Sequence, residues 1–350
     1  MAKPQKTEVQ RVPRKLPPWG EVPRAQLTAP DGLLLVDKPQ GATSHDVVGA
    51  VRRLAATRKV GHAGTLDPMA TGLLTIGIGR ATKLLNYLTG CDKTYQAEIC
   101  FGLNTTTEDA EGEPIYQNNL AEQRNLSRRL KELTSAEIDA AILEFTGAQL
   151  QVPSSVSALK INGKRAYELV RAGEQVELPP RPIVVYRFER ISDPVYSEEI
   201  IDGVPLVSFL VEVSVSAGTY IRALARDLGE KLQVGAHLRM LRRIDVGSWN
   251  VQDAWEVATL ANEISAGNEL PVISLSEVCL EFFPRITVSE AEAADLVHGR
   301  FVTPRKVLPS SSGIVKRDDG VFAAFKEDGT VVSLCVNRGK WIKPELLLSL

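Results

Sequence analysis

The stretch Gly61-His62-Ala63-Gly64-Thr65-Leu66-Asp67-Pro68 decides how the rest of the chain is organised. Its glycines permit backbone conformations closed to other residues, and Pro68 lacks an amide donor and fixes φ, which predicts a rigid loop. The loop presents one carboxylate, Asp67, and one imidazole, His62, without the i,i+4 spacing of a helical zinc-binding pair. The apolar run at residues 69–79 is typical of a buried strand and would support the loop from behind.

Taken alone, the dipeptide Asp67-Pro68 has two interpretations. Most such dipeptides are simple turns, whereas a polar side chain on a loop held by a rigid scaffold is a common place for catalysis. The longer sequence GHAGTLDPMATGLL, at residues 61–74, resembles the catalytic motif of the TruB family of bacterial tRNA pseudouridine synthases. In that family the nucleophilic aspartate stands where Asp67 stands here.

The composition indicates a folded protein without a global preference for nucleic acid. The 350 residues and 44% hydrophobic content predict two domains with a packed core. The chain has 41 Lys and Arg residues but 43 Asp and Glu residues, so its net charge is −2. Any RNA contact must therefore come from local basic patches. No apolar run reaches transmembrane length and no signal peptide is apparent, so we expect a cytoplasmic protein without membrane contact.

The four cysteines are far apart in the sequence and form no C-x-x-C pair. This spacing argues against a disulfide framework and against a zinc site. We therefore expect buried thiols in a reducing cytoplasm, with no metal and no organic cofactor. The cysteines are Cys91, Cys100, Cys279 and Cys335.

Three regions are expected along the chain. Residues 1–30 hold six prolines and six basic residues against two acidic ones, which predicts a disordered basic tail. Residues 31–275 would form the catalytic domain. Residues 284–350 contain the hairpin signals Asp319-Gly320 and Asp328-Gly329 and predict a small β-rich domain. That domain resembles the PUA-like RNA-binding module of the TruB family, and the family resemblance implies an α+β fold with a mixed, largely antiparallel sheet and flanking helices.

Two further motifs carry the resemblance. Lys93-Thr94-Tyr95 opens an alternating strand. A strand tyrosine is most often a packing residue, but the family resemblance implies that Tyr95 stacks on the target uracil. The run Gly218-Thr219-Tyr220-Ile221-Arg222 resembles a second family motif, in which the arginine pairs with the nucleophile and the tyrosine holds the substrate. Ser44 and Thr219 are each expected to cap the helix that follows. A guanidinium beside Asp67 would favour its ionised form.

Basic residues near these motifs are candidates for contacts with the RNA backbone. In the run at residues 235–243, Leu241 corresponds to a family leucine that packs on the target base. Without the resemblance it would be a core residue. The neighbouring Arg242 and Arg243 would then lie close to phosphates. A cluster at Lys160, Lys164 and Arg165 has two equally supported interpretations: it contacts RNA phosphates, or it is a solvent-exposed face. It lies near the position where Pro153-Ser154 replaces the family's double proline.

Together, the candidate site residues indicate an isomerase. Asp67 is the one carboxylate at a recognisable spacing, and residues 108–113 are expected to be a solvated acidic turn. A glycoside hydrolase normally needs two carboxyl groups, whereas breaking and remaking a bond to the same base can proceed with one. The resemblance implies the tRNA T-loop uridine at position 55 as substrate. We expect a monomer, although the sequence alone does not fix the oligomeric state. Attack of Asp67 at C1′, addition at C6 and a glycal route all remain open.

The role of His62 and the class of protein each have alternatives. The resemblance implies that the His62 ring fills the gap left when the target base is extruded. The alternative is that His62 acts as a general base. We prefer the role of a wedge that fills the vacated stack, because a ring in that position is badly placed for proton transfer. A non-catalytic RNA-binding or tRNA-folding protein would not require Asp67. A nucleoside hydrolase would release free uracil.

Overall fold

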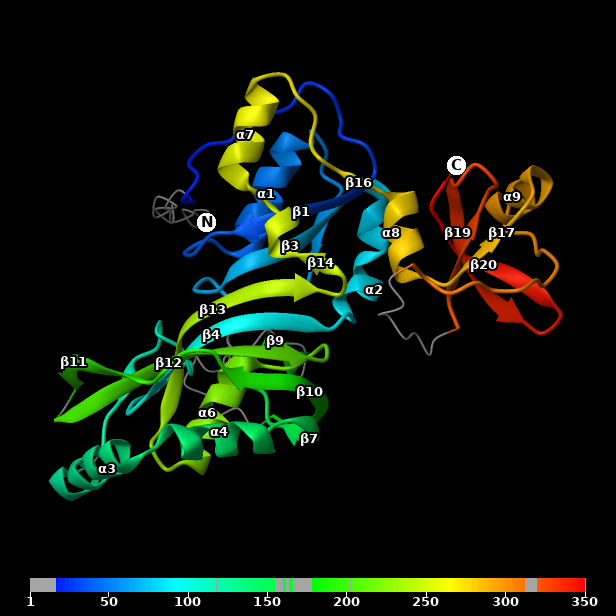
Figure 1. Cartoon of the computed structure of the whole chain (residues 1–350). Helices are drawn as coiled ribbons and strands as arrows, with labels where there is room; N and C mark the ends of the chain where they lie inside the picture. Colours follow the sequence, from blue (N-terminus) through cyan, green and yellow to red (C-terminus); the bar gives the residue numbers. More distant parts are fainter. Residues whose placement is uncertain are drawn as a thin grey trace, which may run out of the picture.

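A twelve-stranded mixed sheet forms the body of the protein (Figure 1). The computed structural model describes residues 17–349 except 118, 155–159, 162–163, 166–177, 202 and 312–319. The main path of the sheet runs in the order β15-β1-β3-β13-β4-β12-β10-β7. These strands are β15 (Trp255–Glu256), β1 (Gly32–Lys38), β3 (Thr71–Ile78), β13 (Ala236–Val246), β4 (Lys93–Phe101), β12 (Val204–Val215), β10 (Arg181–Arg190) and β7 (Gly147–Gln151).

Shorter elements complete the body. β2 (Val60–Ala63) pairs with β3, β11 (Val195–Ile201) with β12, β14 (Trp249–Asn250) with β13, and β16 (Ile273–Ser274) with β1. Two small separate pairs are β5 (Asn104–Thr105) with β6 (Pro114–Ile115), and β8 (Lys160–Ile161) with β9 (Lys164–Arg165). The 3-10 helices are η1 (Gly79–Lys83) and η2 (Val251–Asp253). Most pairings are antiparallel, which confirms the mixed, largely antiparallel sheet.

The sheet consists of two halves that meet at β13. One half holds β1, β2 and β3, and the other holds β4, β12 and β10. β13 pairs antiparallel with β4 along most of its length, but it pairs parallel with β3 at only Arg242↔Thr71 and Arg243↔Gly72. Gly72 has φ +99°, and a Cβ atom there would lie 2.2 Å from the Arg243 carbonyl oxygen. Only glycine therefore permits this junction.

Helices cover both faces of the sheet. One face packs against α1 (Ser44–Leu54), α3 (Leu120–Glu132), α4 (Ser135–Glu144), α6 (Ile221–Lys231) and α7 (Val257–Ser265). The same core cluster includes Leu66 and Met69 of the Asp67 loop, together with Tyr95. The opposite face packs against α2 (Leu85–Thr89) and α8 (Leu275–Phe282). Alternation along β1, with Leu34 facing one core and Leu33 the other, follows the two-residue period of a strand.

A small C-terminal β-domain lies beside α8 (Figure 1). It contains a four-stranded sheet in the order β17 (Arg285–Thr287), β18 (Phe322–Phe325), β19 (Val331–Arg338) and β20 (Trp341–Leu347), with α9 (Glu290–Val297). The hairpin predicted at Asp328-Gly329 is confirmed, because it joins antiparallel β18 and β19. Asp319 of the other hairpin signal lies outside the described residues. All four cysteines are buried and none forms a disulfide, as predicted.

The expected disordered tail is wrong for residues 17–30. The amides of Ala25 and Ala29 donate to the carbonyls of Arg53 and Ala55 at 3.1 Å each. Arg53 donates to the Val22 carbonyl at 2.9 Å, and Val22 is buried in the main core. A proline-rich segment can thus dock through backbone hydrogen bonds and a few apolar contacts, here Val22, Trp19 and Ala29, which composition does not reveal.

Two predicted helix caps are displaced. Thr43, rather than Ser44, caps α1 and forms a capping box with Asp46. Tyr220, rather than Thr219, occupies the N-cap of α6, while the Thr219 hydroxyl donates to the Ser216 carbonyl at 2.9 Å. No helix in the described part of the chain is long and apolar enough to cross a membrane.

Candidate active site

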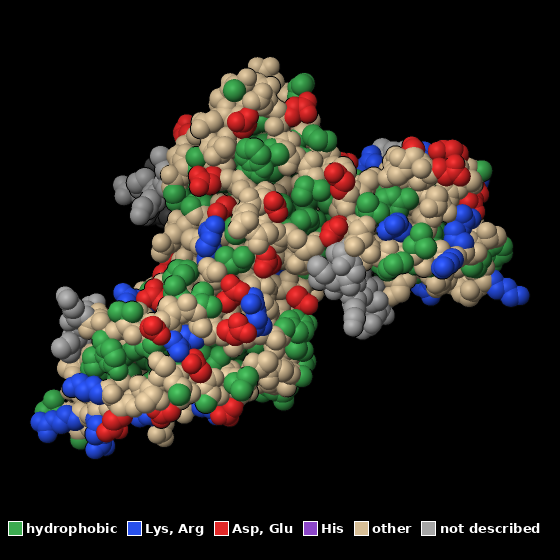
Figure 2. Space-filling model, viewed as in Figure 1, with side chains coloured by type: hydrophobic (Ala, Val, Ile, Leu, Met, Phe, Trp, Pro, Cys, Tyr) green, Lys and Arg blue, Asp and Glu red, His purple; other side chains and the backbone are tan. Residues whose placement is uncertain are grey.

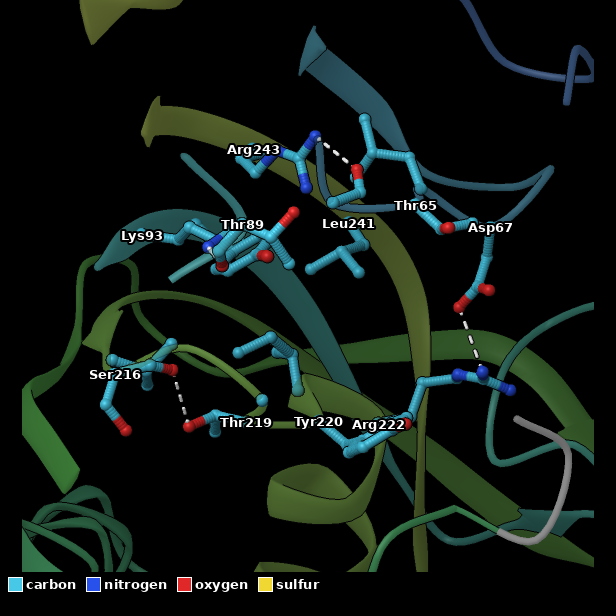
Figure 3. Close-up of a pocket in the computed structure, with 16 residues that line it drawn as sticks. Thr65, Asp67, Thr89, Lys93, Ser216, Thr219, Tyr220, Arg222, Leu241 and Arg243 are labelled. Carbon is cyan, nitrogen blue, oxygen red and sulfur yellow. Dashed lines mark hydrogen bonds and ion pairs between the residues drawn. The ribbon is translucent and has the colours of Figure 1, made fainter. Parts of the chain in front are cut away.

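A cavity of about 300 Å³ opens where the two halves of the sheet meet (Figure 3). Its walls come from the Asp67 loop, the first residues of β4, the segment joining β12 to α6, and β13. The lining residues are Gly64, Thr65, Leu66, Asp67, Thr89, Lys93, Tyr95, Val215, Ser216, Gly218, Thr219, Tyr220, Ile221, Arg222, Leu241 and Arg243. Asp67 contributes the only carboxylate among these residues. The volume lies at the lower end of ordinary ligand sites, about 300–1,000 Å³, and suits a single nucleoside.

Asp67 forms an ion pair with Arg222 across the cavity wall (Figure 3). The distance from Asp67 Oδ2 to Arg222 Nη2 is 2.9 Å. The Asp67 side chain is 39% exposed, whereas that of Arg222 is 6% exposed. The carboxylate therefore faces the cavity while its charge partner is fixed beneath it.

Arg222 also contacts a second carboxylate, which the sequence analysis missed. Its Nη1 atom lies 3.3 Å from Oδ2 of buried Asp109 and donates to the Thr107 carbonyl at 2.9 Å. The Thr107 hydroxyl and the Glu111 amide donate to Asp109 Oδ1. Asp109 thus holds the guanidinium in the orientation that meets Asp67.

The prediction of a solvated acidic turn at residues 108–113 is accordingly wrong for Glu108 and Asp109, whereas Glu111 and Glu113 are exposed. Asp109 is buried, and Glu108 accepts a hydrogen bond from Arg226 at 2.7 Å. Burial raises the pKa of Glu111, and the neighbouring charges of Asp109 and Asp67 raise it further. The sequence signal that was missed is the pair of hydroxyl residues Thr105 and Thr107. Their hydroxyls donate hydrogen bonds to the carbonyl oxygen and to Oδ1 of Asp109, respectively.

The Asp67 loop is held by groups that precede it in the chain. The Ser44 hydroxyl donates to the Leu66 carbonyl at 3.1 Å and accepts from the Leu66 amide at 2.9 Å. The Gly41 amide donates to the Pro68 carbonyl at 2.9 Å. Fully buried Lys38 donates to the carbonyls of Ala42 at 2.6 Å and Pro68 at 3.3 Å. These bonds prevent the residues on both sides of Asp67 from shifting.

Two lysines near the site have lowered basicity. Burial lowers the pKa of Lys38 to about 8, although the charge of Asp67 opposes this. Burial also lowers the pKa of Lys93 to about 8, and the charge of Arg243 adds to the effect. Lys93 lines the cavity and donates to the carbonyls of Cys91 and Thr89. Lys38 anchors the loop and Lys93 forms part of the cavity wall.

Arg242 and Arg243 differ from the expected surface cations. Arg243 is 1% exposed and donates to the Leu73 carbonyl at 2.7 Å and the Gly64 carbonyl at 3.0 Å. It therefore fixes the start of the Asp67 loop, and its burial contradicts a surface contact with phosphates. Arg242 binds Asp37 through both terminal nitrogens, at 3.0 and 2.6 Å. Alternation along a strand buries one of two adjacent arginines and leaves the other to pair at the surface.

The predicted substrate residues Tyr95, Tyr220 and Leu241 all line the cavity. Tyr95 and Leu241 are buried on neighbouring strands β4 and β13. The Tyr220 backbone is fixed by buried Gln151, whose side-chain amide donates to the Tyr220 carbonyl and accepts from its amide, at 3.0 and 2.9 Å. The cavity therefore has a rigid apolar floor beside the Asp67 and Arg222 pair.

His62 lies in β2 and is not among the cavity-lining residues. Its ring contacts His45 edge to face, with centroids 5.6 Å apart. Burial, followed by the neighbouring His45 and Arg243, lowers the pKa of His62 to about 4. The ring is therefore neutral near pH 7, and its buried Nδ1 atom has no hydrogen-bond partner in the described structure.

Three predicted backbone contacts lie outside the side chains that the structure describes. These are Lys160, Lys164 and Arg165, whose strands pair with each other. Among the residues described, no group of three His, Cys, Asp or Glu side chains is arranged to hold a metal ion.

The fold is that of the pseudouridine synthases. A crystal structure of a Cbf5-Nop10-Gar1 complex superposes with a TM-score of 0.64 at 23% identity, covering 90% of this chain and 84% of that chain. A structure of an H/ACA RNP bound to a substrate RNA containing 2′-deoxyuridine gives 0.62 at 22% identity, with the same coverage. At these identities the likeness concerns the fold alone.

Sequence comparison places the chain within one branch of that fold. Residues 52–221 match the model of the TruB family pseudouridylate synthase N-terminal domain. Residues 222–275 match the tRNA pseudouridylate synthase B C-terminal domain, and residues 283–348 match the tRNA pseudouridine synthase II C-terminal region.

Full-length relatives agree with these matches. The tRNA pseudouridine synthase B of Arthrobacter sp. (strain FB24) is 44% identical over 91% of this chain and 96% of its own length. That of Mycobacterium leprae (strain TN) is 45% identical over 91% and 90%. The chain belongs to the TruB family, which confirms the resemblance found in its motifs.

Proposed function

We propose that the chain converts uridine to pseudouridine in tRNA, at position 55 of the T-loop, with Asp67 as the nucleophile. The observation that carries this proposal is the Asp67 carboxylate facing a nucleoside-sized cavity, 2.9 Å from buried Arg222. The relatives at 41–46% identity carry the name tRNA pseudouridine synthase B. That name supports tRNA as the substrate.

The cavity accounts for how the reaction would proceed. An extruded uracil would stack on Tyr95 beside Leu241, with its ribose near Asp67. The bond from N1 to C1′ breaks, the base turns within the cavity, and a bond from C5 to C1′ forms. C5 loses a proton and N1 gains one, so nothing is added or released. All three routes, by attack at C1′, by addition at C6 or through a glycal, can use an ionised Asp67.

The carboxylates near the site favour isomerisation over hydrolysis. Hydrolysis of a glycosidic bond normally uses two carboxyl groups that flank the bond. Asp109 shares Arg222 with Asp67 and Glu111 lies close enough to sense the charge of Asp67, but neither Asp109 nor Glu111 lines the cavity. One cavity carboxylate suits a reaction in which the leaving base returns to the same sugar.

His62 would act as the wedge that fills the stack after extrusion. Its position in β2, outside the cavity wall, supports a role in holding the RNA rather than in proton transfer. His62→Ala should therefore impair turnover of folded tRNA more than turnover of a short unstructured RNA. Equal losses on both substrates would instead favour a general base.

The proposal includes the setting of the enzyme. It binds the T-arm as a monomer, requires no metal or organic cofactor, and works in the cytoplasm. Residues 284–350 serve as an RNA-binding domain attached to the catalytic body. Lys160, Lys164 and Arg165 contact the RNA backbone.

The direct test is incubation with unmodified tRNA transcript labelled in its uracil, followed by mapping of pseudouridine. Label retained in the RNA as pseudouridine at position 55 supports the proposal. Free labelled uracil would identify a nucleoside hydrolase. Binding without either product would identify an RNA-binding or tRNA-folding protein.

A further inference from the structure

Helix α3 presents a cationic surface far from the cavity. Its buried face is formed by Leu126 and Leu130, which pack into the main core. The opposite face exposes Arg124, Arg128 and Lys131, spaced at i, i+4 and i+7. This spacing aligns their side chains along one side of the helix. We call these three residues the α3 basic face.

The α3 basic face lacks carboxylate partners within the described part of the chain. Arg128 donates to Asn125 at 3.3 Å, and no ion pair is formed by any of the three. Nearby cations of the same half of the sheet are paired instead: Arg129 with Glu137, Arg190 with Asp139 and Lys231 with Glu144. Three cations without an ion pair among the described residues thus lie together along one side of α3.

The α3 basic face also borders a shallow hollow. A cavity of about 630 Å³ is lined by the three cations together with Leu120, Gln123, Ser127, Glu132 and Gly203. Glu132 is the one carboxylate in this lining. In the space-filling view, Lys and Arg side chains gather at the lower-left end of the molecule, where α3 lies (Figures 1 and 2). Shape and charge together suit a ligand that carries several phosphates.

The position of the α3 basic face sets which part of an RNA it could reach. α3 packs into the same core cluster as the Asp67 loop and α6, so it covers the same face of the sheet. It contacts β12, whose Val207 pairs with Phe101 at the far end of β4 from Tyr95. Six residues of strand at ~3.3 Å each separate Tyr95 from Phe101 by about 20 Å. A nucleotide in the cavity cannot span this distance, but a larger folded RNA can.

We propose that the α3 basic face binds the phosphate backbone of the tRNA substrate outside the arm that enters the cavity. This inference rests on the proposed function, because it assigns a second contact to the same RNA. The contact would raise affinity for whole tRNA and discriminate it from isolated stem-loops. It would leave the chemical step unchanged.

The test neutralises the three cations together in the full-length protein. The triple variant Arg124→Gln, Arg128→Gln and Lys131→Gln keeps good helix formers on α3. We expect its Kd for tRNA to rise about tenfold, and the slope of log K against log salt to become shallower by about 2–3, since each lost phosphate contact removes nearly one unit. Affinity for an isolated T-arm hairpin and kcat at saturating tRNA should stay unchanged.

Two controls accompany the triple variant. Lys231→Gln, Arg187→Gln and Arg239→Gln remove the same charge from cations that already pair with Glu144, Glu212 and Glu98. This variant should retain most of the affinity for tRNA. A second variant, Arg124→Lys with Arg128→Lys, keeps the charge and should bind tRNA as the wild type does, with far-UV circular dichroism showing an intact helix.

The outcomes separate this inference from the proposed function. An unchanged tRNA Kd, or an equal loss for tRNA and hairpin, would overturn the α3 contact. If the wild type binds tRNA but forms no pseudouridine, the proposed function fails, while a weaker, less salt-dependent tRNA complex of the triple variant still supports the contact.

Discussion

Asp67 Oδ2 and Arg222 Nη2 lie 2.9 Å apart, although the two residues belong to opposite halves of the sheet. Asp67 stands on the loop between β2 and β3, and Arg222 lies in the first turn of α6. The ion pair therefore forms only when both halves are correctly aligned. Asp109 and the Thr107 carbonyl fix the arginine from its buried side.

Removing the charge of Asp67 should abolish turnover while RNA binding persists. Asp67→Asn keeps the shape of the side chain, and loss of a nucleophile can cost on the order of 10⁶ in kcat. Asp67→Glu should also fail, since a displacement of about 1 Å can cost ~10²-fold. Product, tRNA affinity and Tm should be measured on one preparation. Pseudouridine formation near the wild-type rate in Asp67→Asn would make Asp67 a turn residue.

Asp109 should matter for both stability and catalysis. Asp109→Ala leaves the buried Arg222 charge without its second carboxylate, and breaking a buried pair costs about 3–5 kcal/mol. We expect a lower free energy of unfolding in urea and a reduced kcat, with KM for tRNA little changed. Arg222→Lys should behave similarly, because one ammonium cannot reproduce the fork that reaches Asp67 and Asp109 together. A normal kcat in either variant would contradict this role.

The Ser44 hydroxyl should be required for the geometry of the Asp67 loop. Ser44→Ala leaves the buried Leu66 amide and carbonyl without their partner, at about 1–3 kcal/mol for an unsatisfied group. We expect both Tm and kcat to fall. Thr43→Ala is the matched control, since it removes the neighbouring helix cap, worth ~1 kcal/mol, without touching Leu66. Equal kcat values for the two variants would show that Ser44 only stabilises the fold.

The neutral His62 ring should make the protein sensitive to mild acid. The pKa of His62 is about 4 in the folded chain against an ordinary value of 6.5. Between these values the unfolded state binds the additional proton, so the stability associated with His62 is complete above pH 6.5 and decreases as the pH falls toward 4. Urea unfolding at pH 7 and pH 5 should show a larger loss in the wild type than in His62→Gln. NMR titration of the ring to a midpoint near 6.5 would refute this.

The docked N-terminal segment should contribute to stability but not to chemistry. Deleting residues 1–30 exposes the site where Val22 is buried and removes the backbone bonds to Arg53 and Ala55. We expect Tm to fall relative to a protein shortened by residues 1–16, with kcat equal in both at a temperature where each is folded. Identical melting curves would show that residues 17–30 add nothing.

The sequence predicted those parts of the site that are local in the chain. The loop around Asp67, the tyrosine at the start of β4 and Arg222 in α6 each stand in a short motif, and the family resemblance linked them. Asp109 was missed because the neighbouring sequence, rich in Asp, Glu and Gly, is typical of a polar turn. Its burial depends on an isolated bridge from Asp109 to Leu238, a pairing that local sequence does not encode.

Arg243 was misjudged for a related reason. Adjacent arginines suggest a surface patch, and only the pairing of β13 with β3 shows that one of them turns inward to the Gly64 carbonyl. The Ser44 hydroxyl was likewise taken as a helix cap, since Ser at a helix start usually has that role. Each error concerns a polar side chain whose partner lies far away in the sequence.

The late position of β13 in the chain has a consequence for synthesis on the ribosome. Asp67 leaves the ribosome long before Arg222, Leu241 and Arg243, and at ~5–20 residues per second the interval is on the order of ten seconds or more. During that interval the nascent chain carries Asp67 without its charge partner Arg222 and without the strand that joins β3 to β4. With Asp67 as the proposed nucleophile, we expect a growing chain to form no pseudouridine until β13 enters the sheet and completes the cavity.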